Sequence, residues 1–364
     1  MKRIIFKSLF LGLSIASMAG GPGNNGTKGA MELTINPWAG SSGWNGINNA
    51  NVKGVEAFNL NIGGLSNINS TNINLTYTDY LHNAGIKINA FGIAQKIGSS
   101  SYIGISYMSM NFGDIQRTDV NNPDGGIGTF SPRFNNFGIG YTYKFSNAIS
   151  CGLVFRGISE IGAADVKART ASLDAGVQYS TKTSKKDEKA IKGEDFHFGI
   201  SLRNVGPNGS FSGDGLASRV TDADNVQRTM QIRTASFQLP TQLLIGLSYD
   251  IKLDKQPIVY NNRLTLAANY SSNSYANNEF GLGFEYGYKR IFALRAGYQY
   301  EAQLTDMVKR INAFSGIAAG ASIYIPLKKA SDNLLAFDYS YRDSRFLGGT
   351  NSLGIRLEFG ESSK

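Results

Sequence analysis

The chain has 364 residues, a formal net charge of +9 and a small share of charged side chains, 17%. No stretch beyond the N-terminal region approaches about 18 consecutive apolar residues, which excludes helical membrane spans. The single cysteine, Cys151, excludes an internal disulfide, and with only two histidines a transition-metal site is not expected. Glycine accounts for 43 residues, tyrosine for 18 and phenylalanine for 21, which favours an all-β protein with closely spaced backbones.

The first 19 residues have the features of a secretory signal peptide. Lys2, Arg3 and Lys7 form a basic start, a short apolar run follows, and Ser17-Met18-Ala19 is a suitable cleavage site. A membrane anchor is the alternative, but the apolar run is too short to span a bilayer. We therefore expect residues 1–19 to be removed. Behind such a signal, the positive charge indicates contact with anionic lipid or lipopolysaccharide, and no nucleic-acid partner is expected.

Residues 20–70 separate the signal from the first clear strand. The stretch 20–29, GGPGNNGTKG, is typical of a flexible leader. The stretch 30–70 holds Trp38 and Trp44, the only tryptophans, and is too rich in glycine and asparagine for a lipid-facing strand. Two interpretations remain open: a hatch folded inside a barrel, where protein shelters the irregular backbone, or a disordered periplasmic arm. The paired tryptophans favour the hatch.

From residue 71 onward, apolar and polar residues alternate with the period of a β-strand. In 136–145, NFGIGYTYKF, aromatic and aliphatic side chains share one face, and glycine, threonine and lysine share the other. In 280–300, FGLGFEYGYKRIFALRAGYQY, the alternation runs twice, once on each side of Lys289 and Arg290. The whole pattern predicts about 14 strands. They lie near 71–80, 85–96, 101–112, 134–145, 148–159, 169–180, 196–205, 241–253, 262–271, 278–288, 291–301, 314–325, 333–342 and 351–360.

These strands predict an all-β fold, a transmembrane antiparallel β-barrel over residues 71–360. A tilted strand of about ten residues crosses a bilayer, whereas strands of soluble sandwiches usually have about 5–6 residues. A soluble sandwich would also carry a clearly charged outer face. The aromatic faces are then expected to meet lipid, and the glycines and charges to line the lumen. Arg295, Glu285, Arg356 and Glu358 are expected to pair there, because unpaired buried charges are costly.

The connectors between the strands fit a barrel whose two chain ends both lie in the periplasm. Short connectors such as 98–100 and 289–290 then face the periplasm, and long ones such as 113–133 and 206–240 face the outside. The basic stretch 181–195 is an exception, because it is long and still falls on the periplasmic side.

Several stretches resemble the PorV/PorQ family, which belongs to the wider group of FadL-like barrels. NIGGLSNINSTNINLTYTDYL resembles that family's Asn-Pro-Ala-Gly-Leu segment and first strand. Further matching stretches are YIGISYMSMNFGDIQRTD, GTFSPRFNNFGIGYTYKF, FHFGISLRNVGPNGSF, ALRAGYQY and LLAFDYSYRDSRFLGGTNSLGIRLEF. The resemblance covers residues 35–360, and the order and spacing of the stretches are more specific than any one motif. Residues 61–65, Asn-Ile-Gly-Gly-Leu, lack the family's proline, which leaves this turn less rigid.

The resemblance implies an outer-membrane barrel of about 14 strands with an N-terminal hatch inside it. The expected hatch residues are Trp38, Trp44, Asn61, Gly63, Gly64 and Leu65. It also implies a non-enzymatic role in type IX protein secretion, where such barrels bind the C-terminal domains of exported cargo and work with the translocon pore. The more distant FadL-like relatives carry hydrophobic small molecules inward, and this is the alternative function.

No catalytic, cofactor-binding or metal site is expected. His82 follows Asp79 in a short connector and would need a nearby serine to form an acyl hydrolase. A lipopolysaccharide-modifying enzyme acting through His82 is the third function considered. His197 falls on the polar face of its strand and is expected to be a lumen histidine with polar partners. The stretch 118–126, TDVNNPDGG, lacks the ligand spacing of a calcium loop and predicts a turn.

Overall fold

The computed structural model describes most of the chain. The described residues are 28–162, 166–181, 195–221, 224–253, 262–306, 308, 310, 312–327 and 333–360. The predicted signal peptide, most of the predicted leader and residues 182–194 of the basic 181–195 stretch lie outside them. Nothing in the structure therefore bears on these three predictions.

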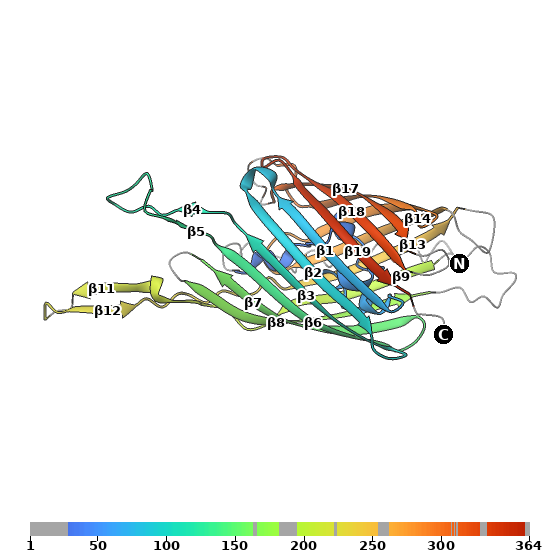
Figure 1. Ribbon diagram of the computed structural model, residues 1–364, viewed down its shortest axis with the longest axis horizontal. Coiled ribbons are helices and arrows are strands. Elements are labelled where there is room, and N and C mark those ends of the chain that lie inside the picture. The colour runs from blue at the N-terminus through green and yellow to red at the C-terminus, as the bar shows by residue number, and fades with distance from the viewer. Residues whose placement is uncertain are drawn as a thin grey trace.

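Antiparallel strands form a closed barrel of 14 long strands, as the alternation predicts (Figure 1). The long strands are β1 (Thr71–Tyr80), β2 (Ile86–Lys96), β3 (Ser101–Asn111), β6 (Arg133–Lys144), β7 (Ile149–Ile161), β8 (Lys167–Ser180), β9 (Asp195–Val205), β13 (Gln242–Lys252), β14 (Asn262–Asn273), β15 (Glu279–Tyr288), β16 (Phe292–Glu301), β17 (Phe314–Pro326), β18 (Leu334–Ser344) and β19 (Thr350–Phe359). Each pairs with the next long strand in the sequence, and β1 pairs with β19 to close the barrel. Each long strand therefore has a hydrogen-bonded neighbour on both sides. A sheet in lipid requires this, because lipid cannot pair with free backbone groups.

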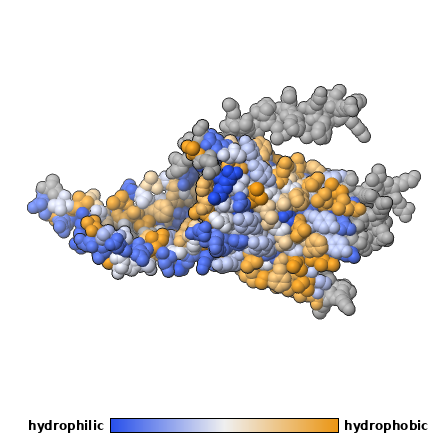
Figure 2. All heavy atoms as spheres, turned by 90° about the horizontal axis from the view of Figure 1, so that it is seen from above, coloured by the Kyte–Doolittle hydropathy of each residue, from blue (hydrophilic) through white to orange (hydrophobic). Residues whose placement is uncertain are grey.

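The two faces of the strands point as predicted, apolar outward and polar inward. On β1, Leu75 and Tyr77 are 49% and 42% exposed on the outside, whereas Asn74 and Thr76 are buried on the inside. Hydrophobic residues gather on the barrel wall, and the loops that project from one end are mainly hydrophilic (Figure 2). The oily faces therefore match a hydrocarbon solvent, and the prediction of a transmembrane barrel is confirmed.

The long connectors 113–133 and 206–240 lie at one end of the barrel, which we call the outer end, and the tight turns 98–100 and 289–290 lie at the opposite, inner end (Figure 1). Two small hairpins project from the outer end: β4 (Ile115–Gln116) with β5 (Thr129–Phe130), and β11 (Ala217–Thr221) with β12 (Gln227–Gln231). The other small elements between long strands are η7 (His82–Ala84), β10 (Phe211–Ser212) and η8 (Asp214–Leu216). In outer-membrane barrels the long loops face the outside and the short turns face the periplasm.

The described residues before β1, 28–70, lie inside the barrel, and we call them the internal segment (Figure 1). It contains four short helices, η4 (Met31–Thr34), α2 (Ala39–Ser42), η5 (Gly54–Asn59) and η6 (Ile62–Ser66). Helix α2 contacts β17, β18 and β19, η5 contacts β1 to β3, and η6 contacts β3 and β6 to β8. Among the described residues, no helix has both the length and the apolar character to cross a membrane.

Candidate functional site: the barrel interior

Glycines on the lumen face allow the backbone of the internal segment to approach the wall. A Cβ atom at Gly199 would lie 2.7 Å from the Asn49 carbonyl oxygen. A Cβ atom at Gly297 would lie 2.7 Å from the Trp44 carbonyl oxygen. Such separations are too short for any side chain, so these positions require glycine. This explains why the predicted strands alternate glycine with aromatic residues.

Polar side chains on the lumen face bind the backbone of the internal segment. Among the uncharged ones, four donate to its carbonyl oxygens at 2.7 to 3.1 Å. The pairs are Thr142 Oγ1 to Ile62, Ser150 Oγ to Gly63, Gln178 Nε2 to Asn49, and Ser201 Oγ to Leu60. Because buried backbone groups must be paired, these contacts replace the internal hydrogen bonds that an irregular segment lacks. The segment is held by many reversible contacts.

Asn61 and its two following glycines lie against β7, β8 and β9. The Asn61 side chain caps η6 by accepting from the Gly63 N–H at 3.1 Å. Its amide donates to the carbonyl oxygens of Val177 at 2.9 Å and Ile200 at 3.3 Å, so one side chain joins η6 to both β8 and β9. A Cβ atom at Gly63 would approach the Gln178 nitrogen to 2.8 Å. The Gly63-Gly64 pair thus suits this close contact.

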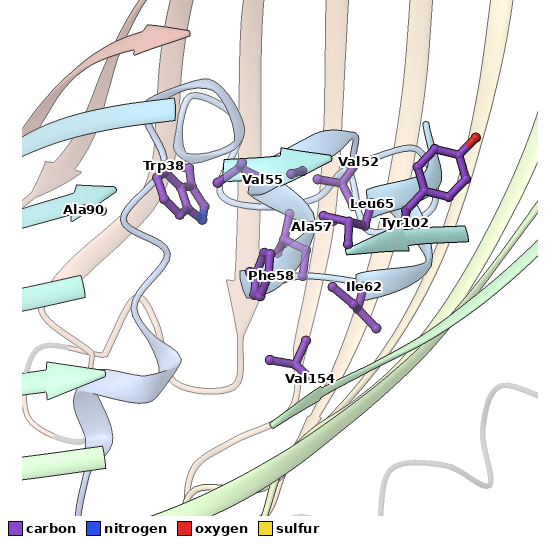
Figure 3. Packing of buried hydrophobic residues seen from close by; sticks show 12 residues of the cluster. Trp38, Val52, Val55, Ala57, Phe58, Ile62, Leu65, Ala90, Tyr102 and Val154 are labelled. Carbon is purple, nitrogen blue, oxygen red and sulfur yellow. The ribbon is translucent and has the colours of Figure 1, made fainter. Parts of the chain in front are cut away.

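The two tryptophans and Leu65 are buried but belong to two different clusters. Trp38 and Leu65 join the apolar cluster between the internal segment and the wall (Figure 3). The Trp38 indole donates to the Asn59 side chain at 2.9 Å. Trp44 packs instead with Ile47 and with β14 on the far side of the lumen. The structure therefore places all the expected hatch residues inside the barrel, in two groups.

A row of charged side chains crosses the lumen near the inner end, as the sequence predicts. Arg295 Nε donates to Glu285 at 2.6 Å, and Arg263 also binds Glu285. Arg356 lies 3.5 Å from Asp338 and 3.5 Å from Glu358. The four residues expected to pair in the lumen do so, Arg295 with Glu285 and Arg356 with Glu358, and Asp338 is an additional partner. The arrangement compensates the desolvation of these charges.

Two cavities occupy opposite ends of the lumen. The outer cavity, about 540 Å³, is lined by the internal segment and by the outer ends of β13 to β18. The inner cavity, about 850 Å³, is lined by the opposite face of the internal segment and by inner strand ends, including Lys252 of β13 and Lys144 of β6. No lining residue is common to both cavities. The internal segment therefore separates two compartments, each large enough for a small molecule.

The histidines and the acidic loop have ordinary surroundings. His82 Nδ1 lies 2.5 Å from Asp79 Oδ2 on the exposed outer end, and His197 Nε2 lies 3.4 Å from Asp250 Oδ2 in the lumen. In the loop 113–128, hydrogen bonds from Asn122 to Asp119 hold the pKa of that carboxyl below its usual value, which agrees with the predicted turn. Among the described residues, no three His, Cys, Asp or Glu side chains are close enough to bind a metal ion.

Several lumen residues were not singled out by sequence reasoning. Arg156 is fully buried, donates to Asp174 at 2.7 Å and also binds the Phe58 carbonyl of η5. Gln178 binds two carbonyls of the internal segment. Both fall on the polar face of their strands, so the alternation in the sequence could have identified them as lumen residues. Glu279 and Glu301 line the outer cavity, and their strands and connecting turn were both predicted.

Comparison with known proteins gives the fold. No protein-family model and no curated protein matches the sequence. The toluene transporter TbuX of Ralstonia pickettii matches with a TM-score of 0.51 and 12% identity, over 88% of this chain and 98% of that one. A TodX deletion mutant, a monoaromatic hydrocarbon channel, matches with a TM-score of 0.50 and 12% identity, over 88% and 97%. A Pseudomonas aeruginosa FadL homologue matches with a TM-score of 0.45 and 11% identity, over 88% and 96%. The neighbours are FadL-like outer-membrane barrels, and this chain shares their fold.

Proposed function

We propose that the protein is an outer-membrane channel for small hydrophobic molecules, and that the internal segment acts as its hatch. The observation that carries the proposal is the outer cavity, a compartment of about 540 Å³ that ends at the internal segment. Its wall includes Ile35, Ile47, Leu60 and Leu244 beside polar groups. Small-molecule sites in proteins are cavities of about 300–1,000 Å³ with such mixed linings.

An apolar patch at the outer end of the lumen supports a hydrophobic substrate. Ile88, Met108, Met110, Phe134 and Ile158 face inward from β2, β3, β6 and β7, where the rest of the lumen is mainly polar. The internal segment and the loop before β13 cover this patch with apolar side chains. Methionine is flexible and polarisable, so such a surface can repack around ligands of different shape. An apolar molecule that displaced this cover would meet an apolar surface.

The hatch role follows from how the internal segment is held. It separates the two cavities, and its contacts with the wall are hydrogen bonds and packing contacts that can break and re-form. A substrate that reaches the inner cavity would have to displace part of this segment. Two structural neighbours are described as a toluene transporter and a monoaromatic hydrocarbon channel, and the proposed substrate class agrees with theirs.

Uptake of labelled toluene into proteoliposomes tests this proposal. Leu244→Asn places a polar group in the outer cavity and should reduce uptake at least severalfold. The matched control is Leu334→Asn, the same change at a buried leucine that lines the already polar inner cavity, and it should leave uptake near wild type. Wild-type uptake no faster than in protein-free liposomes would refute the channel. Equal loss in both variants would contradict the role of the outer cavity.

A second function, the binding of exported proteins in type IX secretion, is favoured by the projecting hairpins and by the PorV/PorQ-like stretches. Val120, Met230 and Ile232 in the outer loops are 97%, 57% and 57% exposed. Exposed apolar groups of this kind suit a protein partner. Replacing 218–230 by a glycine-serine linker should abolish recovery of cargo C-terminal domains and translocon protein in pull-downs. Failure of the wild-type protein to recover either would rule out this function.

A further inference from the structure

The outer cavity contains a pair of carboxylates that face each other across two strands. This arrangement does not stabilise the sheet. The register of β15 and β16 sets Glu279 directly opposite Glu301. Both side chains line the outer cavity. Further along the same two strands, the register sets Glu285 opposite Arg295, which form an ion pair. Like charges directly opposite one another destabilise a sheet, whereas opposite charges stabilise it.

The Glu301 carboxylate has a hydrogen-bonding capacity that the described residues do not fill. Glu301 is 3% exposed, and its Oε1 atom has no hydrogen-bond partner among them. The Asn312 side chain binds this carboxylate, and Gln299 Nε2 donates to Glu279 at 2.5 Å. These donors are neutral amides. A buried carboxylate that lacks a cation in contact is expensive unless it takes up a proton, so a cation from outside the chain would stabilise the charged form of this pair.

Arginines surround the pair and attract it from a distance, Arg310 acting on Glu301 and Arg342 on Glu279, but the hydrogen bonds of their guanidinium groups go to neutral acceptors. Arg203 donates to Gln242 at 3.2 Å and to a carbonyl of η4 at 3.0 Å. Arg342 donates to Asn45 at 3.1 Å and lies 4.0 Å from the centre of the Phe314 ring. Arg310 donates to backbone carbonyls. Within the part of the chain that the structure describes, none of the three forms an ion pair with either glutamate.

We propose that the outer cavity binds the ammonium group of a small amphipathic amine between Glu279 and Glu301. This inference rests on the proposed channel function. Residues opposite one another in a sheet have Cβ atoms about 4.5–5.5 Å apart, so one ammonium can contact both carboxylates. It would donate to one oxygen of each carboxylate; Glu301 Oε1, which has no partner, is closed off from the cavity and would have to turn toward it to accept. The apolar body of the ligand would lie against Ile47, Leu60 and the edge-to-face ring pair of Tyr80 and Phe314. The substrate class is therefore an alkyl- or arylammonium ion.

Calorimetric titration of the full-length mature protein in detergent at neutral pH tests this assignment. The probes are benzylammonium chloride, toluene and sodium benzoate, which share a ring and differ in charge. Benzylammonium should bind at least about tenfold more tightly than the other two, since charge-assisted hydrogen bonds are the strong ones. The double variant Glu279→Gln and Glu301→Gln should lose that difference between benzylammonium and toluene. Glu358→Gln, in the inner cavity, is the control and should change nothing.

The outcomes separate this inference from the proposed channel. Equal binding of toluene and benzylammonium, unchanged in the double variant, would overturn the amine site and leave the channel standing. Tighter binding of benzoate would overturn it also. If calcium chloride gives a heat of binding that is lost in the double variant, and benzylammonium does not bind, the two carboxylates form a metal site instead. Failure of all three ring compounds to bind would remove both proposals. Retained heat-modifiable mobility on gels verifies that the variants are folded.

Discussion

Adding a single methyl group at Gly297 should loosen the hatch. This glycine lies on β16, and the backbone of the internal segment passes close to it. A Cβ atom there would meet three backbone atoms of Trp44: the carbonyl oxygen at 2.7 Å and the carbonyl carbon and Cα at 2.8 Å. Backbone atoms cannot rotate away as a side chain can. In Gly297→Ala the internal segment must therefore shift, and such overpacking costs about 1–3 kcal/mol.

The size of this penalty sets the expected change in gating. If the position of the internal segment against the wall is destabilised by about 2 kcal/mol, the fraction of molecules in which the segment is displaced rises about thirtyfold. Single-channel recording in planar bilayers should then show far more frequent openings than in the wild type, and toluene flux should rise. Gly157→Ala is the control, because a Cβ atom on this outward-facing glycine of β7 would meet nothing within 4 Å. Wild-type opening frequency and stability in Gly297→Ala would refute the reasoning.

Three further changes test the contacts that hold the structure. Asn61→Ala removes the cap of η6 and its bonds to β8 and β9, so limited proteolysis of the internal segment should accelerate as about 1–3 kcal/mol is lost. Replacing Lys289 and Arg290, which have φ angles of 48° and 53°, by Asn-Gly should raise the urea midpoint, and a lower midpoint would contradict this. Arg295→Met should cost about 3 kcal/mol in urea unfolding, and adding Glu285→Leu should recover most of it.

The sequence was sufficient to locate the barrel strands. Each predicted strand agrees with the structure to within about two residues, because lipid on one side and a packed lumen on the other impose a strict two-residue period. The tight turn at Lys289 and Arg290 also fixes the register of its hairpin, which brings Glu285 opposite Arg295. The same register sets Glu279 opposite Glu301, so this pair was also predictable but was not recognised.

The conformation of the internal segment was not predictable in the same way. Its short helices follow no period, and they are shaped by strands far away in the sequence: Asn61, for example, binds carbonyls on β8 and β9. The two cavities depend equally on distant side chains, since the outer one combines residues from η4 with others from β18. Composition indicated that residues 30–70 are not strands, but only the folded barrel supplies the contacts that define them.

A reversible covalent link between the internal segment and the wall tests the hatch most directly. A Cβ atom at Gly354 of β19 would lie 3.1 Å from the Ala39 Cβ of α2, within a few tenths of an ångström of the roughly 3.5–4.5 Å of a disulfide. In a Cys151→Ser background, Ala39→Cys with Gly354→Cys should block toluene flux into proteoliposomes when oxidised and restore it on reduction. Equal flux in both states, with the disulfide shown to be fully formed by mass spectrometry, would contradict the account.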